Sequence, residues 1–392
     1  MKKIIHSIAI MYFIGVGYSY AGVFDNIVDR IVSNNPDVES AMANARAETS
    51  SLASENNLSD PEIEGDYLIG PSSANNRWGV SISQSFDWPG VYKARSMANA
   101  TASNAYNLMA ASTRLEKRFE ITNGLIDYVN EAKNIKLLEE VLHNLDTLYK
   151  SYEKGYSHGE FTILDVNTLK IERVRVIGQL RQWNSRHEDT MRSLSMLNGG
   201  NDCAPLVKEL DEYPIVRLKD LEYYLSSVEK DPLIKSNSEM TNYSNDMARV
   251  ASLSKYPGFS IGYTHNYEEG MHFNGITVGV TIPVFSQRHK VQAAKDRALA
   301  YETANMAYRV NRTSKVAAAY SRVNSLNEDI SLLGPIFETT DNMTILKKSL
   351  DGGQISILSY IEGMNYFLLA RQDYLDLQYR YNIAVAELTR YD

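Results

Sequence analysis

Residues 258–262, with the sequence GFSIG, match the G-x-S-x-G pattern that surrounds the nucleophile of many serine hydrolases. In those enzymes a sharp turn between a strand and a helix exposes the serine. Ser260 instead lies within a run in which apolar and small residues alternate, which is typical of a strand. We therefore expect no catalysis at Ser260.

The histidines and the single cysteine indicate no metal or cofactor site. No two of the seven histidines are three or four residues apart, and the sequence contains no H-E-x-x-H, no C-x-x-C and no phosphate-binding glycine loop. His265 and His272 flank an expected hairpin loop and are near enough in sequence to meet across it, although lone exposed histidines are commoner. Cys203 has no second cysteine to pair with, and we regard it as incidental. We expect no enzyme activity, no metal and no cofactor.

The N-terminus has the pattern of a secretory signal peptide. Lys2 and Lys3 precede an apolar stretch over residues 8–16, and Ser-Tyr-Ala at residues 19–21 has the small-x-small form of a cleavage site. We predict that residues 1–21 are a signal peptide. No other apolar run reaches about 18 residues, the length needed for a membrane-spanning helix. The formal net charge of −8 gives no basic footprint for nucleic acid.

The sequence contains an internal duplication at about half its length. Pro61 corresponds to Pro257 and Gly79 to Gly275, each 196 residues later, and residues 159–164 (GEFTIL) match residues 353–358 (GQISIL) with an offset of 194. Matching anchors in the same order indicate a repeated unit. We predict a first repeat over residues 22–205 and a second over residues 206–392, together forming one domain.

The residue pattern of each repeat predicts the same order of elements: a helix, a β-hairpin, a very long helix, a glycine turn and another long helix. The expected fold is therefore mainly α with a small β part. The strands are expected at about residues 61–69 and 77–88, and at about 258–267 and 273–284. No proline occurs from residue 93 to 156, which at about 1.5 Å per residue predicts a helix of about 90–100 Å. Apolar residues at coiled-coil spacing along the long helices indicate packing.

The second and fourth strands alternate between an apolar and a small polar face. Trp78 and Trp88 share the apolar face ten residues apart, about 25 Å along the membrane normal for a tilted strand, which is the spacing of a membrane aromatic girdle. Four such strands cannot close a barrel, and an open edge in lipid leaves backbone groups unpaired. Three chains would supply twelve strands, enough for a barrel with a lumen.

This organisation resembles the TolC-like outer-membrane efflux family over essentially the whole chain after the signal peptide. The motifs that carry the resemblance are residues 83–90 (SQSFDWPG), 159–166 (GEFTILDV) and 353–358. The resemblance implies a homotrimer in the outer membrane of a Gram-negative bacterium, with a 12-stranded β-barrel on an α-helical periplasmic tunnel. It also implies docking to a periplasmic adaptor (membrane fusion) protein and to an RND-type or ABC-type inner-membrane pump. The outer-membrane lipid would contact the barrel.

The resemblance also assigns candidate functional residues. The helix turns that would contact the adaptor contain His158, Gly159, Glu160, Phe161, Gly352, Gly353 and Gln354. The two acidic positions of the family's periplasmic gate fall at Ser359 and Glu362, and only Glu362 keeps the carboxylate. Glu160, where many members carry leucine, resembles the CzcC-like metal-efflux branch.

The expected function is therefore a passive export duct, with heavy-metal cations as one possible cargo. A duct for type I protein secretion or for drug efflux is the alternative, because the sequence does not determine the cargo. From a different class, an exported coiled-coil scaffold or adaptor protein would also explain the long helices. That alternative leaves the apolar strand faces unexplained.

Overall fold

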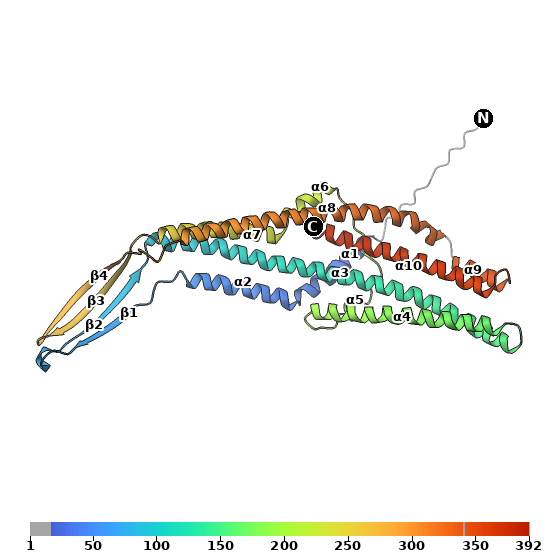
Figure 1. Cartoon of the computed structure of the whole chain (residues 1–392), viewed down its shortest axis with the longest axis horizontal. Coiled ribbons are helices and arrows are strands. Elements are labelled where there is room, and N and C mark those ends of the chain that lie inside the picture. The colour runs from blue at the N-terminus through green and yellow to red at the C-terminus, as the bar shows by residue number, and fades with distance from the viewer. Residues whose placement is uncertain (1–16, 340–341, 392) are drawn as a thin grey trace, which may run out of the picture. The chain divides into compact units, whose positions relative to one another are not determined.

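The structure, a computed structural model, describes residues 17–339 and 342–391. The first sixteen residues of the predicted signal peptide lie outside this part of the chain, and helix α1 (Gly17–Ser33) begins within the predicted peptide. Helices and one antiparallel sheet make up the fold (Figure 1), so the expected mainly α fold with a small β part is confirmed. None of the helices described is both long enough and apolar enough to cross a membrane.

The chain forms two compact units, each built from segments far apart in the sequence. Of the described residues, the first contains 17–39, 114–227, 313–339 and 342–391, and the second contains 40–113 and 228–312. Each unit therefore takes segments from both predicted repeats. The assignment of residues 22–205 and 206–392 as repeats of one domain stays a prediction.

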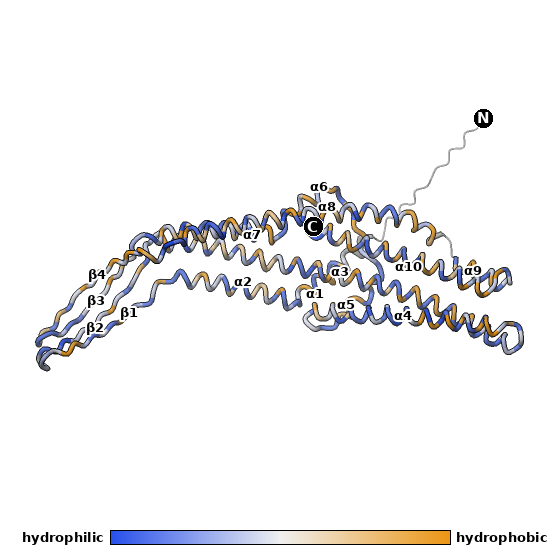
Figure 2. The backbone as a smooth tube through the Cα atoms, viewed as in Figure 1, coloured by the Kyte–Doolittle hydropathy of each residue, from blue (hydrophilic) through white to orange (hydrophobic). Residues whose placement is uncertain are grey.

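The first unit is helical. Besides α1 it contains the second part of α3 (Pro89–Ser157) and of α8 (Lys290–Thr339). Its other helices are α4 (Ile163–Leu197), α5 (Ala204–Val207), α6 (Leu221–Ser227), α9 (Asn342–Asp351) and α10 (Ile357–Leu388). Figure 2 shows apolar and polar residues interspersed along these helices, as amphipathic packing requires.

Two apolar clusters among the described residues contribute to the core of the first unit. One joins α1, α3 and α4 through side chains such as Ile31, Leu125 and Leu194, and it includes the buried Cys203. The other joins α3, α4, α9 and α10 through side chains such as Leu145, Leu169 and Tyr360. The predicted packing stripes on α3 and α10 therefore take part in this core, although Tyr156 at the end of α3 is 46% exposed.

The second unit joins the sheet to helices. It contains most of α2 (Pro36–Ser54), the first parts of α3 and α8, α7 (Pro232–Leu253) and the short turns η1 (Ser73–Asn75) and η2 (Val228–Lys230). Val91, Ala94 and Ala98 on α3 pack with Val250 on α7. The small alanines let the helices approach closely, and the buried Ser236 hydroxyl of α7 donates to the Ala105 carbonyl of α3 at 2.8 Å.

The sheet contains four strands in the order β1 (Glu62–Leu68), β2 (Arg77–Phe86), β3 (Gly258–Glu268) and β4 (Met271–Thr281). Every neighbouring pair is antiparallel (Figure 1). The predicted small sheet is thus present, and it joins the two hairpins through β2 and β3. Its outer strands are β1 and β4.

The end of β2 and the start of β4 differ from the prediction because of the backbone turns that follow or precede these strands. β2 ends two residues before Trp88, because Pro89 begins α3 and the Trp88 carbonyl already accepts from the Val91 amide at 2.8 Å. β4 begins at Met271, because the hairpin turn is only Glu269 and Gly270, both with positive φ (50° and 83°). Such two-residue turns match the twist of the strands.

Candidate functional site: the sheet and the helix turns

One face of the sheet is largely apolar and exposed, with Gln84, His265, His272 and Asn274 as its polar members. The register places Ile82 of β2 opposite Tyr263 of β3, which in turn lies opposite Ile276 of β4. The Ile276 and Val278 side chains are 78% and 73% exposed. We call this surface the apolar sheet face; its members are Ile63, Tyr67, Trp78, Val80, Ile82, Phe86, Phe259, Ile261, Tyr263, Tyr267, Ile276, Val278 and Val280. Contiguous apolar surfaces of this kind mark contact with lipid or protein.

The opposite face of the sheet is small and polar in its central rows. Ser83 lies between Glu62 and Gly262, and Ser81 lies between Glu64 and Thr264. An ion pair between the Arg77 guanidinium and the Glu268 carboxylate, at 2.6 Å, joins β2 to β3. The expected alternation between the two faces is therefore present in β2 and β4.

Trp78 and Trp88 occupy different local environments. Trp78 lies on β2 and stacks on Tyr267 of β3, with ring centroids 6.0 Å apart. Trp88 lies beyond the end of β2 and packs on Tyr256 and Phe259, with centroids 5.4 Å and 5.9 Å away. The distance between Trp78 and Trp88 was calculated for two residues on one strand, and Trp88 lies outside that strand. The aromatic girdle therefore stays a prediction.

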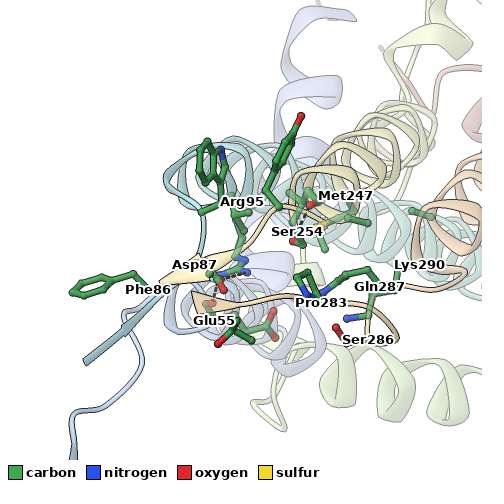
Figure 3. Close-up of a pocket in the computed structure, with 18 of the residues that line it drawn as sticks. Glu55, Phe86, Asp87, Arg95, Met247, Ser254, Pro283, Ser286, Gln287 and Lys290 are labelled. Carbon is green, nitrogen blue, oxygen red and sulfur yellow. Dashed lines mark hydrogen bonds and ion pairs between the residues drawn. The ribbon is translucent and has the colours of Figure 1, made fainter. Parts of the chain in front are cut away.

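A cavity of about 750 Å³ lies in the second unit where the strands meet the helices (Figure 3). Arg95 of α3 lines this cavity and links two of its other lining residues. The Arg95 guanidinium pairs with the Asp87 carboxylate at 3.1 Å and donates to the Glu55 carbonyl at 3.1 Å. Lys290 and Arg297 add two more positive charges to the lining. The Ser254 hydroxyl is engaged, because it donates to the Val250 carbonyl at 2.9 Å. The lining of the cavity is thus partly charged. Ser254 is not arranged as a nucleophile, because its hydroxyl proton is already donated to a backbone carbonyl.

The pentapeptide around Ser260 has no catalytic geometry. Residues 258–262 lie within β3, where Ser260 is paired with Ser85 on one side and Gly279 on the other. A nucleophile elbow needs a turn from a strand into a helix. The strand assignment made from the sequence is therefore correct.

The first helix turn joins α3 to α4 and contains four of the predicted tip residues, His158, Gly159, Glu160 and Phe161. The Glu160 amide donates to the Gly155 carbonyl at 2.9 Å and the Gly159 amide to the Tyr156 carbonyl at 3.0 Å. Gly159 has φ +78°. These bonds form a Schellman motif, which satisfies the last carbonyls of a helix and favours glycine at this position.

The second helix turn, between α9 and α10, has the same construction. The Gln354 amide donates to the Ser349 carbonyl at 2.9 Å and the Gly353 amide to the Leu350 carbonyl at 3.0 Å. Gly353 has φ +67°, and the preceding Gly352 donates to the Lys348 carbonyl at 2.9 Å. Phe161 in the first turn and Ile355 in the second both pack on the same apolar cluster of the first unit.

Polar side chains cap the helices that leave these turns. Thr162 caps α4, and its hydroxyl forms a reciprocal capping box with Asp165. Ser356 caps α10, and its hydroxyl accepts from the amide of Ser359 at 3.1 Å. Ser359, one candidate gate residue, thus belongs to the cap. Glu362, the other, is exposed on α10 and forms no ion pair within the described part of the chain.

A polar group that the sequence did not indicate lies near the turns. The Glu172 carboxylate on α4 is buried and bound by the Arg175 guanidinium, with Nε 3.0 Å from Oε1. Arg175 also donates to the Asn365 side chain of α10. The group links the two helices that follow the turns. The i,i+3 spacing of Glu172 and Arg175 on α4 was visible in the sequence, whereas the contact of Arg175 with Asn365 on α10 was not.

Comparison with known proteins gives matches only among solved structures. No protein-family model and no curated protein matches the sequence. The outer membrane channel CmeC of Campylobacter jejuni is 17% identical, with 94% of this chain and 85% of that chain covered and a TM-score of 0.73. CusC, described by its transmembrane channel formation, is 15% identical, with 97% and 95% covered and a TM-score of 0.74.

The outer membrane protein VceC from Vibrio cholerae is 14% identical, with 94% of this chain and 96% of that chain covered and a TM-score of 0.74. The match extends over nearly the full length of each structure. The chain therefore has the fold of these outer membrane channels, and the resemblance to the TolC-like family holds at the level of fold.

Proposed function

We propose that this chain is one subunit of a trimeric outer-membrane duct that passively exports cargo received from a periplasmic adaptor and an inner-membrane pump. The observation that carries the proposal is the apolar sheet face. A four-stranded sheet with one exposed apolar face and two outer strands fits a segment of a barrel wall, with lipid outside and the small polar face inside. The likeness to solved outer membrane channels supports it.

The outer strands explain why a trimer is proposed. In hydrocarbon each unpaired backbone amide or carbonyl costs several kcal/mol, so β1 and β4 need partners. Pairing β1 of one subunit with β4 of the next closes a ring. Three subunits give twelve strands, which leaves a lumen, whereas eight strands would be filled by side chains.

The mass and shape of the exported protein test the duct directly. We expect the protein to resist salt extraction from outer membranes and to leave them in mild detergent as a trimer with a hollow stalk, measured by light scattering and electron microscopy. A water-soluble monomer or dimer would overturn the duct and favour the coiled-coil scaffold.

Two features support cations as the cargo. Glu62, Glu64 and Asp66 of β1 lie on the small polar face, which in the proposed barrel lines the lumen. Glu362 is exposed close to the second helix turn. Carboxylates along a pore favour cations. We therefore prefer metal cations to secreted proteins or drugs.

Single-channel recording tests the role of Glu362. Glu362→Gln removes the charge with little change of shape, and we expect a lower preference for cations over anions. Glu188→Gln, at an exposed position on α4, is the matched control and should leave selectivity unchanged. Equal selectivity of wild type and Glu362→Gln would remove Glu362 from the proposed gate.

A further inference from the structure

Two imidazole rings meet near the turn of the second hairpin, on the same side as the apolar sheet face. Nε2 of His265 on β3 lies 3.2 Å from Nδ1 of His272 on β4, and the ring centroids are 5.2 Å apart. The register pairs His272 with Tyr267, so the histidines are diagonal neighbours across the two strands. Neither ring is buried, and both lie beside the hairpin turn at the end of the sheet, where an ion can reach both nitrogens.

The hydrogen bonds around His265 fix which nitrogen carries its proton. Nδ1 of His265 lies 2.7 Å from Oδ1 of Asn274, and the Tyr263 hydroxyl donates to the same oxygen at 2.7 Å. Because that oxygen accepts, Nδ1 of His265 is the donor, and its Nε2 keeps a lone pair directed at His272. Metal-binding histidines characteristically donate their second ring N–H to an oxygen in this way.

The distance between the two ring nitrogens suits joint coordination of one ion. With metal–nitrogen bonds of about 2.0–2.1 Å, two nitrogens 3.2 Å apart subtend about 100° at the metal, close to the tetrahedral angle. Without an ion, one nitrogen donates a hydrogen bond to the other. Metal binding replaces that bond and places the His272 proton on its other nitrogen.

Aromatic rings hold the pair in place. Trp78 packs on His265 with centroids 5.5 Å apart, and Tyr267 packs on His272 with centroids 5.0 Å apart. Packing of this kind restricts the rotamers of the two ligands, which reduces the ordering cost of binding. The described residues contain no group of three or more His, Cys, Asp or Glu side chains that could hold a metal, so water must complete the coordination.

We propose that His265 and His272 bind one divalent transition-metal ion of the class that prefers imidazole, such as zinc, nickel or copper. Asn274 is a positioning residue, because it acts through the ring of His265. The proposal uses contacts within a single chain and does not rest on the duct. A soluble monomer that binds zinc here would refute the duct alone, and a trimer without the site would refute the site alone.

Zinc titration of the purified full chain, carrying no histidine tag, tests the site. We expect one Zn²⁺ per chain by calorimetry, with affinity at least tenfold weaker in His265→Gln and in His272→Gln. His143→Gln, which changes an exposed histidine on α3, should bind like the wild type. Asn274→Ala should weaken binding roughly tenfold, as the loss of an outer-shell partner does.

Binding of Cu²⁺ distinguishes direct coordination by the two histidines from a role in which they only stabilise the hairpin. Cu²⁺ bound to the wild type should give electron paramagnetic resonance splittings from two ring nitrogens, reduced to one in either histidine variant. All variants are first compared with the wild type by circular dichroism and mass. Unchanged affinity in either histidine variant, or an equal loss in His143→Gln, overturns the two-histidine site, and unchanged affinity in Asn274→Ala overturns the positioning role.

Discussion

The Phe161 ring stacks on the Tyr152 ring with centroids 3.9 Å apart and planes 14° from parallel. The stack closes the first helix turn over Gly155, where an added Cβ would lie 2.5 Å from the Phe161 ring. Phe161→Ala should therefore loosen the turn, since an aromatic pair contributes about 0.5–1.5 kcal/mol beyond its buried area. Hydrogen exchange of residues 155–162 should become faster.

Phe285→Ala is the control for this change, because the Phe285 ring is 85% exposed and has little packing to lose. Exchange at the turn should not respond to it. If Phe161→Ala left exchange of residues 155–162 unchanged, the stack would not be what orders the turn.

The glycines at the two helix turns are expected to be required for their backbone conformation alone. Gly159 and Gly353 have positive φ, and a Cβ at either would meet nothing within 4 Å. Substitution by alanine should cost about 1–2 kcal/mol each, the cost of left-handed backbone for a residue with a side chain. Thermal unfolding of each variant measures the change.

Gly178 is the control position for these substitutions, because it distinguishes the cost of a left-handed backbone from any effect of an added Cβ. It also has open space around it, but it lies inside α4 and has no positive φ. Gly178→Ala should stabilise the chain by roughly 0.5–1 kcal/mol, since alanine is the better helix former. A lower unfolding temperature for Gly178→Ala than for Gly159→Ala would contradict the argument.

A buried acid is expected to make the first unit less stable at high pH. Desolvation raises the pKa of Glu131 on α3 to about 7, with a smaller upward effect from Asp127, while a hydrogen bond from Thr190 at 2.9 Å and the charge of Arg186 lower it. Burial lowers the pKa of His187, whose Nδ1 lies 3.4 Å from the Glu131 carboxylate. These opposite directions favour a neutral pair rather than an ion pair.

The sign of the pH dependence follows from the raised pKa. The folded chain holds the Glu131 proton more tightly than the unfolded chain does, so stability falls as the pH rises from the ordinary glutamate pKa of 4.5 to the folded-state pKa of about 7. Glu131→Gln should remove that loss and be the more stable protein at pH 8, whereas the exposed Glu140→Gln should follow the wild type. Unfolding temperatures at pH 5 and pH 8 decide, and a destabilised Glu131→Gln at pH 8 would point to a genuine ion pair.

The alternation of β2 and β4 was predictable because period two assigns each residue to a face without knowledge of the partner strand. The contact between His265 and His272 could be suggested from their places on either side of the loop, but it could not be established, because the predicted loop placed His272 outside the strand. Only the two-residue turn at Glu269 and Gly270 sets the register that brings the rings together.

The helix turns were likewise predictable, because glycine with positive φ leaves a local signal at Gly159 and Gly353. The pairing of Glu131 with His187 leaves none, since it depends on how α3 and α4 pack against each other. Contacts between elements distant in sequence are the part of the site that local pattern cannot supply.

Adjacent residues on β4 test which face of the sheet meets lipid. Ile276 lies on the apolar sheet face and Thr277 on the small polar face. In the proposed barrel an arginine facing lipid costs about 2–4 kcal/mol near the middle of the bilayer, whereas one facing the lumen remains hydrated. Ile276→Arg should therefore lower the amount of trimer assembled in the outer membrane, and Thr277→Arg should assemble normally and alter conductance. Equal assembly of the two variants would mean that the apolar sheet face does not contact lipid.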